Sequence, residues 1–209
     1  MSIAQNLITL GADMLPQTTL IAVSKQQPDE RIDAALNAGH RVYGENRVQE
    51  AQERWAPRKE IYDDLVLHLI GPLQTNKVKD AVTLFDVIHT LDREKLARKL
   101  ADEMAAQNKK IPCFIQVNIG DEDQKSGVAI HDLPAFLKYC RDDCGLTIIG
   151  LMCIPPADEP AALYFALLKK YADHLGLDQL SMGMSGDYKK AIALGATHVR
   201  VGSAVFGAR

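Results

Sequence analysis

Residues 20–25, with the sequence LIAVSK, are the stretch from which the fold can be worked out. Leu20, Ile21 and Val23 make a short apolar run, which is typical of a buried strand in a parallel sheet. Lys25 comes at the carboxyl end of this predicted strand. In α/β folds ligands bind at that edge, because the loops that leave the strands form the mouth of the site.

The position of Lys25 allows two interpretations. A lysine at the rim of a sheet is partly removed from water, which favours its neutral amine over the charged ammonium. The neutral amine can attack a carbonyl carbon. Lys25 would then form a Schiff base. In the alternative interpretation, Lys25 ends a strand and points into water.

The composition predicts one compact domain covering residues 1–209. The chain of 209 residues is 47% hydrophobic and 24% charged, which provides enough apolar side chains for a large core. Its net charge of -3 excludes a broad basic surface for nucleic acid. The sequence has no apolar run long enough to cross a membrane and no secretory leader, so we expect a cytoplasmic protein.

Disulfides and metal binding have no support in the sequence. The four cysteines, Cys113, Cys140, Cys144 and Cys153, show no C-x-x-C spacing, and Cys140 and Cys144 have no second pair of ligands nearby. We therefore expect reduced thiols. The six histidines include no H-E-x-x-H motif, so no metal site is predicted.

Short apolar stretches alternate with stretches of helical period along the chain. The predicted strands cover residues 20–25, 41–43, 65–70, 84–89, 113–119, 146–153, 180–182 and 198–201. The predicted helices cover residues 3–15, 29–38, 48–61, a short segment from 75, a segment capped by Asp92, 133–140, 159–175 and 187–195. This alternation predicts an α/β fold of the (β/α)8 TIM barrel type. Because the chain stops at Arg209, soon after the last predicted strand, we expect the amino-terminal helix to complete the outer ring.

The side-chain pattern also predicts which helix faces are buried and which are solvated. In the helix predicted for residues 159–175, the inward set is Leu163, Leu167, Leu168, Tyr171 and Leu175. A solvated face is predicted for the charged set Glu50, Glu53, Arg54, Arg58, Lys59 and Glu60.

Two segments rich in glycine and serine follow the last two predicted strands. Residues 181–187 (SMGMSGD) leave the seventh strand, and residues 200–203 (RVGS) leave the eighth. In barrels these two loops often bind phosphate, because glycine lets backbone N–H groups approach an anion closely. Ser185 and Ser203 add hydroxyl donors. The two segments together predict a phosphate site.

Arg200 lies inside the apolar strand predicted for residues 198–201. A guanidinium group buried without a partner is costly. Arg200 therefore either pairs with a buried carboxylate or faces a ligand atom that accepts a hydrogen bond.

Three further polar residues have two interpretations each. His68 lies between Leu67 and Leu69 and is either a satisfied core histidine inside the barrel or a residue of the site. Lys77 and Lys125 are predicted in loops at the mouth, where a lysine either attracts phosphate or lies in water. For Lys125 we expect water.

Motifs in a fixed order run through nearly the whole chain. They are residues 22–25 (AVSK), 43–46 (YGEN) with Glu50, 68–77 (HLIGPLQTNK), 125–127 (KSG), 151–152 (LM), 181–185 (SMGMS), 200–203 (RVGS) and 206–207 (FG). With these motifs the sequence resembles the pyridoxal-phosphate-binding proteins of the proline synthetase co-transcribed type, also called pyridoxal phosphate homeostasis proteins. A mild departure from the family pattern is that Gly186 and Asp187 follow Ser185, where an acidic residue often comes directly.

The resemblance implies a barrel like the amino-terminal domain of alanine racemase, with pyridoxal 5'-phosphate (PLP) as cofactor. It implies that Lys25 holds PLP as a Schiff base. The other implied contacts are with the phosphate (Ser185, Gly202, Ser203), the pyridine nitrogen (Arg200) and the phenolic oxygen (Asn46).

A PLP carrier with little or no turnover is the function that the resemblance favours. An arginine cannot accept a proton, so it leaves the pyridine nitrogen unprotonated and weakens the electron sink that catalysis needs. In the racemases a second base comes from another domain and a partner subunit, and here Tyr43 or Tyr188 would have to replace it. We expect a monomer that supplies PLP to apo-enzymes. The alternatives are a PLP-dependent racemase of fold type III and a class I aldolase in which Lys25 attacks a sugar.

Overall fold

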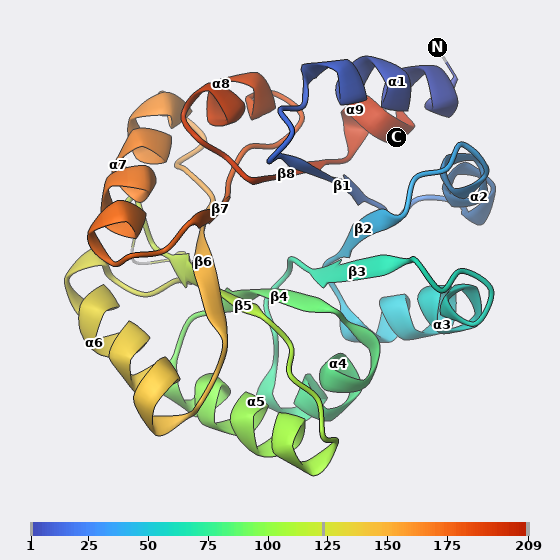
Figure 1. Cartoon of the computed structure of the whole chain (residues 1–209). Helices are drawn as coiled ribbons and strands as arrows, with labels where there is room; N and C mark the ends of the chain where they lie inside the picture. The colour runs from blue at the N-terminus through green and yellow to red at the C-terminus, as the bar shows by residue number, and fades with distance from the viewer. Residues whose placement is uncertain (1, 123, 208–209) are drawn as a thin grey trace.

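The computed structural model describes residues 2–122 and 124–207. Within these residues parallel strands close into a barrel in the order β1-β2-β3-β4-β5-β6-β7-β8, with β8 paired to β1 (Figure 1). The strands are β1 Thr19–Val23, β2 Val42–Glu45, β3 Val66–Leu69, β4 Val87–Leu91, β5 Cys113–Val117, β6 Ile148–Cys153, β7 Gln179–Ser181 and β8 His198–Val201. This confirms the predicted (β/α)8 barrel.

Helices surround the barrel on the outside (Figure 1). The α-helices are α1 Ile3–Asp13, α2 Asp29–Asn37, α3 Val48–Lys59, α4 Val78–Leu84, α5 Glu94–Ala106, α6 Leu133–Lys138, α7 Ala161–His174, α8 Tyr188–Ala193 and α9 Ser203–Phe206. Short helical turns are η1 Thr75–Lys77, η2 Ile130–Asp132 and η3 Tyr139–Asp143.

The amino-terminal helix α1 completes the outer ring, as predicted. It packs against α2 and against α9, the one-turn helix that follows β8 (Figure 1). The Asn6 amide donates to the Val205 carbonyl over 2.9 Å, and the Tyr188 hydroxyl donates to Asp13 Oδ2 over 2.7 Å. These bonds tie the start of the chain to its last two helices.

Several predicted strand boundaries were wrong, among them the end of β1 and the start of β4. β1 ends at Val23, so Ser24 and Lys25 lie beyond the strand. β4 begins at Val87, whereas Leu84 is the last residue of α4. Apolar residues lie on both sides of Asp86, with Leu84 and Phe85 before it and Val87 and Ile88 after it. Apolar residues alone do not distinguish a buried helix end from a buried strand.

Two helix predictions were also wrong. Asp92 is not the cap of α5, because the N-cap position belongs to Arg93 and Asp92 forms an ion pair with Arg93. Leu163 was predicted to face inward but is 67% exposed. The buried face of α7 consists of Phe165, Leu168 and Ala172, which have a helical spacing of their own.

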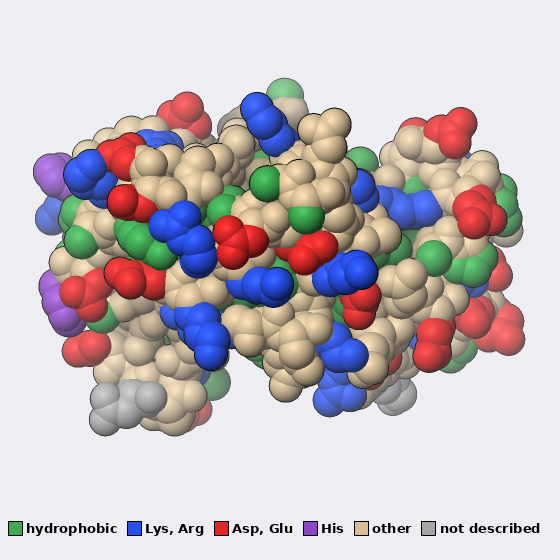
Figure 2. All heavy atoms as spheres, turned by 90° about the horizontal axis from the view of Figure 1, so that it is seen from below, with side chains coloured by type: hydrophobic (Ala, Val, Ile, Leu, Met, Phe, Trp, Pro, Cys, Tyr) green, Lys and Arg blue, Asp and Glu red, His purple; other side chains and the backbone are tan. Residues whose placement is uncertain are grey.

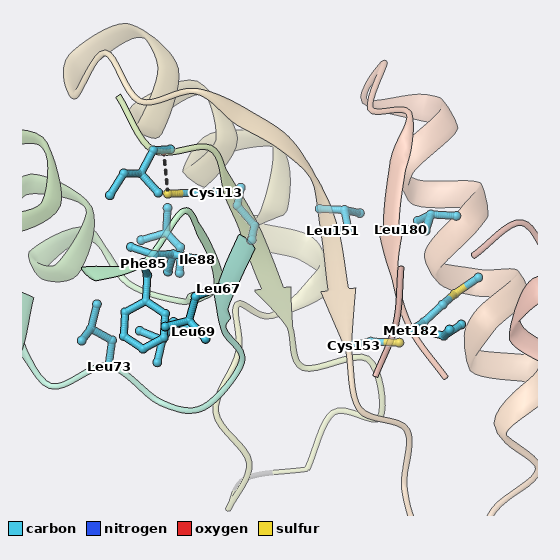
Figure 3. Packing of buried hydrophobic residues seen from close by; sticks show 14 of the residues in the cluster. Leu67, Leu69, Leu73, Phe85, Ile88, Cys113, Leu151, Cys153, Leu180 and Met182 are labelled. Carbon is cyan, nitrogen blue, oxygen red and sulfur yellow. Dashed lines mark hydrogen bonds between the residues drawn. The ribbon is translucent and has the colours of Figure 1, made fainter. Parts of the chain in front are cut away.

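Alternate side chains of each strand face the helices and the barrel interior. The helix-facing set builds the main core, and Figure 3 shows part of it, with Leu67 and Leu69 of β3 close to Ile88 of β4 and Phe85. Leu151 and Leu180 are partners in register on β6 and β7 and lie side by side in the same view. This layer fixes the strands, so that the residues between these positions point into the barrel.

The barrel interior holds a layer of rings from four strands. His68, His89, Phe114 and His198 come from β3, β4, β5 and β8, and their ring centroids lie 4.3 to 5.9 Å apart. Because β8 does not pair with β3, β4 or β5, the contacts of the His198 ring cross the inside of the barrel. His68 is therefore a core histidine, one of its two predicted interpretations.

Figure 2 shows acidic and basic side chains interspersed over one face of the molecule, without a large patch of one sign. That mixture agrees with the net charge of -3. Across residues 2–122 and 124–207, no helix has the length and apolar character that crossing a membrane requires.

Candidate functional site

A cavity of about 400 Å³ opens where the strands end, among the segments that follow β1, β2, β7 and β8. The structure brings all six predicted site residues to its wall: Lys25, Asn46, Ser185, Arg200, Gly202 and Ser203. Residues that the sequence analysis did not assign complete the lining: Val23, Gln27, Ile70, Ile154, Met184, Gly186 and Gly207. Ile154 and Met184 are 39% and 41% exposed, so the cavity wall has an apolar portion open to solvent.

Lys25 is carried by a tight turn directly after β1. The Gln27 N–H donates to the Ser24 carbonyl over 3.1 Å, and Gln26 adopts a left-handed φ of 58°. Lys25 is half-buried. The turn places the lysine at the rim, two residues beyond the end of the strand, while Val23 remains part of the wall.

Arg54 of α3 holds this turn from behind. Its Nη1 donates to the Ser24 carbonyl over 3.1 Å, and its Nη2 donates to the Gln27 carbonyl over 3.1 Å. The same guanidinium forms an ion pair with Glu45 over 3.2 Å. One arginine therefore fixes the backbone on both sides of Lys25.

Glu45, at the end of β2, is fully buried. Its Oε1 accepts from the Ser24 hydroxyl at 2.7 Å, from the Trp55 indole N–H at 3.0 Å and from Arg54. Its Oε2 has no hydrogen-bond partner among the described residues. The carboxylate thus links β1, β2 and α3 behind the Lys25 turn.

The solvated face predicted for α3 was wrong at Arg54 and Arg58. Their side chains are only 19% and 16% exposed, and Arg58 donates to Asp33 of α2. Val48, Ala51 and Trp55 form the buried stripe of α3, and both arginines lie three residues beyond a member of that stripe. In the sequence, the position of these arginines three residues after an apolar residue was the signal from which partly buried ion pairs could have been predicted.

The segments after β7 and β8 meet at Ser185. The Ser185 oxygen accepts from the N–H groups of Gly202 and Ala204 over 3.2 and 3.4 Å. With its oxygen engaged in this way, the hydroxyl hydrogen is left to donate to a ligand. The Ser185 hydroxyl hydrogen and Ser203 therefore remain as donors on one part of the wall, beside Gly202, where the sequence predicts a phosphate site.

Asn46 reaches the cavity because Gly71 allows a close approach. A Cβ on Gly71 would lie 2.3 Å from the Asn46 carbonyl oxygen and 2.6 Å from its Cα, which no side chain tolerates. Asn46 is half-buried and follows directly after Glu45.

Arg200 is 5% exposed and lies in the cavity wall. Its Nη1 donates to Ser181 Oγ over 2.6 Å and its Nη2 donates to the Cys153 carbonyl over 2.9 Å. Burial lowers the pKa of Arg200. Within residues 2–122 and 124–207 it has no ion pair with a carboxylate, so the predicted alternative of a buried carboxylate partner was wrong. The guanidinium has more donors than these two acceptors use.

Two tyrosines considered as a second base do not line the cavity. Tyr43 is fully buried and its hydroxyl donates to the His40 carbonyl. The Tyr188 hydroxyl donates to Asp13, and burial, followed by the neighbouring Asp13, raises the pKa of Tyr188 to about 12.

Lys77 and Lys125 also lie outside the cavity lining. Lys77 contributes instead to a neighbouring hollow that shares Asn46. Lys125 donates to the Pro155 carbonyl and forms an ion pair with Glu122, so the expectation that it lies simply in water was wrong.

The cysteines are free thiols, and burial raises the pKa of Cys113 and Cys153 to about 12. No group of three or more His, Cys, Asp or Glu side chains in the part of the chain that the structure describes is arranged to hold a metal ion.

Known proteins share both the sequence and the fold. The family model "Alanine racemase, N-terminal domain" matches residues 1–209. The pyridoxal phosphate homeostasis protein of Escherichia coli (strain K12) is 39% identical over 204 residues, which are 92% of this chain and 86% of that protein. The protein of that name from Pseudomonas aeruginosa is 42% identical over 195 residues, covering 91% of this chain and 84% of its own. This chain belongs to the pyridoxal phosphate homeostasis protein family.

Solved structures of a family member and of enzymes share the barrel. PipY of Synechococcus elongatus PCC7942, solved with PLP bound, is 37% identical and superposes with a TM-score of 0.91, covering 99% of this chain and 100% of that one. The alanine racemase of Clostridium difficile 630 is 15% identical with a TM-score of 0.80, covering 100% of this chain and 57% of that one. The racemase shares the fold alone.

Proposed function

We propose that this protein binds PLP in the cavity, holds it as a Schiff base on Lys25 and serves in intracellular PLP homeostasis. The observation that carries the proposal is that Lys25, Arg200 and the Ser185 and Ser203 segments line one cavity of about 400 Å³. Ligand pockets run from roughly 300 to 1,000 Å³. The PLP-bound PipY relative supports the choice of ligand.

The residues of the wall fit the three distinctive parts of PLP. The Lys25 amine suits the aldehyde. The Ser185 hydroxyl and the Gly202 and Ser203 segment suit the phosphate, which accepts several hydrogen bonds. Arg200 suits the pyridine nitrogen, because a buried cation whose partners in the described chain are all neutral is relieved by a further acceptor.

Each residue has a stated task in this proposal. The Lys25 amine adds to the aldehyde carbon, and loss of the carbonyl oxygen as water leaves a C=N bond. Bound PLP supplies an electron-accepting ring. Arg200 limits that capacity, since a guanidinium donates to the ring nitrogen and cannot keep it protonated. Arg54 holds the Lys25 turn through the Ser24 and Gln27 carbonyls.

Storage and supply of PLP fit this site better than racemisation. A racemase needs a second base on the far face of the ring, and both candidate tyrosines are engaged elsewhere, Tyr43 with His40 and Tyr188 with Asp13. The six site residues all come from one chain, which supports a monomer as the working unit. The recipients in this proposal are apo forms of PLP-dependent enzymes in the cytoplasm.

Absorption spectroscopy tests the covalent link. We expect a visible band in protein that is loaded with PLP and then separated from unbound PLP, its loss on adding hydroxylamine, and a PLP-labelled peptide containing Lys25 after borohydride reduction. Lys25→Ala should remove the band. Lys77→Ala, which changes a lysine outside the cavity, is the matched control and should keep it. A band that survives in Lys25→Ala would refute the assignment of Lys25.

Chiral analysis tests the low turnover. The loaded protein is incubated with L-alanine and other amino acids, and the D-enantiomers are measured over time. We expect no conversion above that of free PLP. Conversion at enzyme-like rates would refute the carrier function and favour a racemase.

A further inference from the structure

A chain of hydrogen bonds crosses the barrel interior and ends at Arg200 in the cavity wall. His68 Nδ1 lies 2.8 Å from His89 Nε2, and His89 Nδ1 lies 2.8 Å from Ser181 Oγ. Ser181 Oγ in turn accepts from Arg200 over 2.6 Å. His89 and Ser181 are fully buried and His68 is 3% exposed. Three strands, β3, β4 and β7, thus contribute to the support of one guanidinium on β8.

The direction of these bonds follows from Arg200. An arginine only donates, so the Ser181 oxygen is an acceptor toward it. Among the described residues, the other hydrogen-bond partner of that oxygen is His89. A buried hydroxyl donates its hydrogen when an acceptor is in reach, so Ser181 donates to His89 Nδ1. In a neutral ring the hydrogen then sits on Nε2 of His89, which donates to Nδ1 of His68.

The histidines stay neutral in this arrangement. Burial, together with the neighbouring His68, His198 and Arg200, lowers the pKa of His89 well below its usual value. Burial lowers the pKa of His68 to about 3. Arg200 therefore carries the single positive charge at the end of the chain. The bonds that join His68, His89 and Ser181 behind it are hydrogen bonds between neutral groups.

We propose that His89, acting through Ser181, is a positioning residue that aims the Arg200 guanidinium into the cavity and makes the site select an unprotonated ring nitrogen. This inference rests on the proposed binding of PLP. Ser181 and the Cys153 carbonyl take one donor from each terminal nitrogen, which fixes the plane of the guanidinium. The donors that remain match an acceptor atom, whereas a pyridinium N–H would meet only donors.

The surroundings of His89 allow a clean test. Its ring stacks on Phe114 with centroids 4.3 Å apart, so His89→Phe keeps an aromatic ring there and removes the hydrogen bonds. His89→Asn restores an acceptor near the position of Nδ1. His198 belongs to the same ring layer but contacts Thr197 Oγ1 instead, which makes His198→Asn the matched control.

The apo-protein and the PLP complex give separate readouts. In the apo wild type, ¹⁵N NMR should place the hydrogen of His89 on Nε2. For PLP labelled with ¹⁵N in the ring, His89→Phe should raise the Kd about tenfold and move the ring nitrogen shift away from that of the hydrogen-bonded, unprotonated form. His89→Asn should recover most of both changes, and His198→Asn should resemble wild type.

Each outcome decides between the alternatives. A wild type that does not bind PLP refutes the proposed function itself. A His89→Phe protein with wild-type Kd and ring nitrogen shift, beside a Lys25→Ala protein that has lost its visible band, overturns the inference while the proposed function stands. If His89→Phe does not fold, Ser181→Ala gives the decision by the same two readouts, since it removes only the bridging oxygen.

Discussion

Arg54 lies behind the Lys25 turn and is half-buried, whereas Arg200 lies buried in the cavity wall. The two guanidinium groups are balanced in different ways. Arg54 has a fully buried carboxylate partner in Glu45. Arg200 donates only to a hydroxyl and a carbonyl, both uncharged. A buried cation matched within the protein serves the fold, whereas one that retains free donors beside a cavity is available to a ligand.

The comparison predicts opposite consequences for stability and binding. Removing Arg54 leaves the charge of Glu45 without a partner in the core, so the main effect should be a lower free energy of unfolding. Removing Arg200 leaves no charge without a partner, so the main effect should be a lower affinity for the ligand. The first two predictions below separate these effects, and the other two test the surroundings of each arginine.

Arg54→Met should lower the free energy of unfolding by about 3 to 5 kcal/mol, since removing one partner of a buried ion pair leaves the other uncompensated. Urea denaturation of the apo-protein measures this. Lys59→Met is the control, because Lys59 pairs with Asp86, whose side chain is 40% exposed. A loss no larger than in that control would show that the Glu45 pair is not structural.

Arg200→Met should weaken PLP binding about 100-fold, equivalent to about 2.7 kcal/mol, because the ring nitrogen loses its donor. The free energy of unfolding without ligand should change by less than about 1 kcal/mol, as an apolar side chain replaces an unpaired buried cation. PLP titration and urea denaturation are run on the same preparations. Unchanged affinity would remove the distinction between the two arginines.

The ring layer behind Arg200 should make the fold sensitive to acid. Burial, then the charge of Arg200, lowers the pKa of His198 to about 4, below its usual 6.5. The unfolded chain therefore binds a proton that the folded chain does not, and the free energy of unfolding should fall from about pH 6.5 towards pH 4, by up to about 1.4 kcal/mol per pH unit for each such histidine.

His198→Asn tests that dependence. Unfolding free energies measured across the same pH range should fall less steeply in the variant than in wild type. Parallel curves would mean that His198 does not contribute to the acid sensitivity.

Glu45→Gln combined with Arg54→Met should recover about 1 kcal/mol of the loss in Arg54→Met, because the double change removes the stranded charge and keeps an acceptor for Ser24 and Trp55. Completing the double-mutant cycle requires Glu45→Gln alone. Strict additivity of the two single changes would mean that the pair has no coupling energy.

The sequence by itself determined the barrel and six of the residues that line the cavity. The period of the strands and helices is a local property, and the motifs around Lys25, Asn46, Ser185 and Arg200 lie at strand ends, which a parallel barrel must bring to one rim. The start of β4 was predicted wrongly, since apolar residues lie on both sides of Asp86, at the end of α4 and in the strand.

Only the tertiary structure decided what supports these residues from behind. His89 and Ser181 are 92 residues apart, and Arg54 reaches back 30 residues to Ser24. No local pattern encodes such pairs. They depend on which strands face each other across the barrel interior and on which face of α3 packs against the barrel. The physical reason is that periodicity assigns a side chain to a face, whereas its hydrogen-bond partner is set by the packing of distant segments.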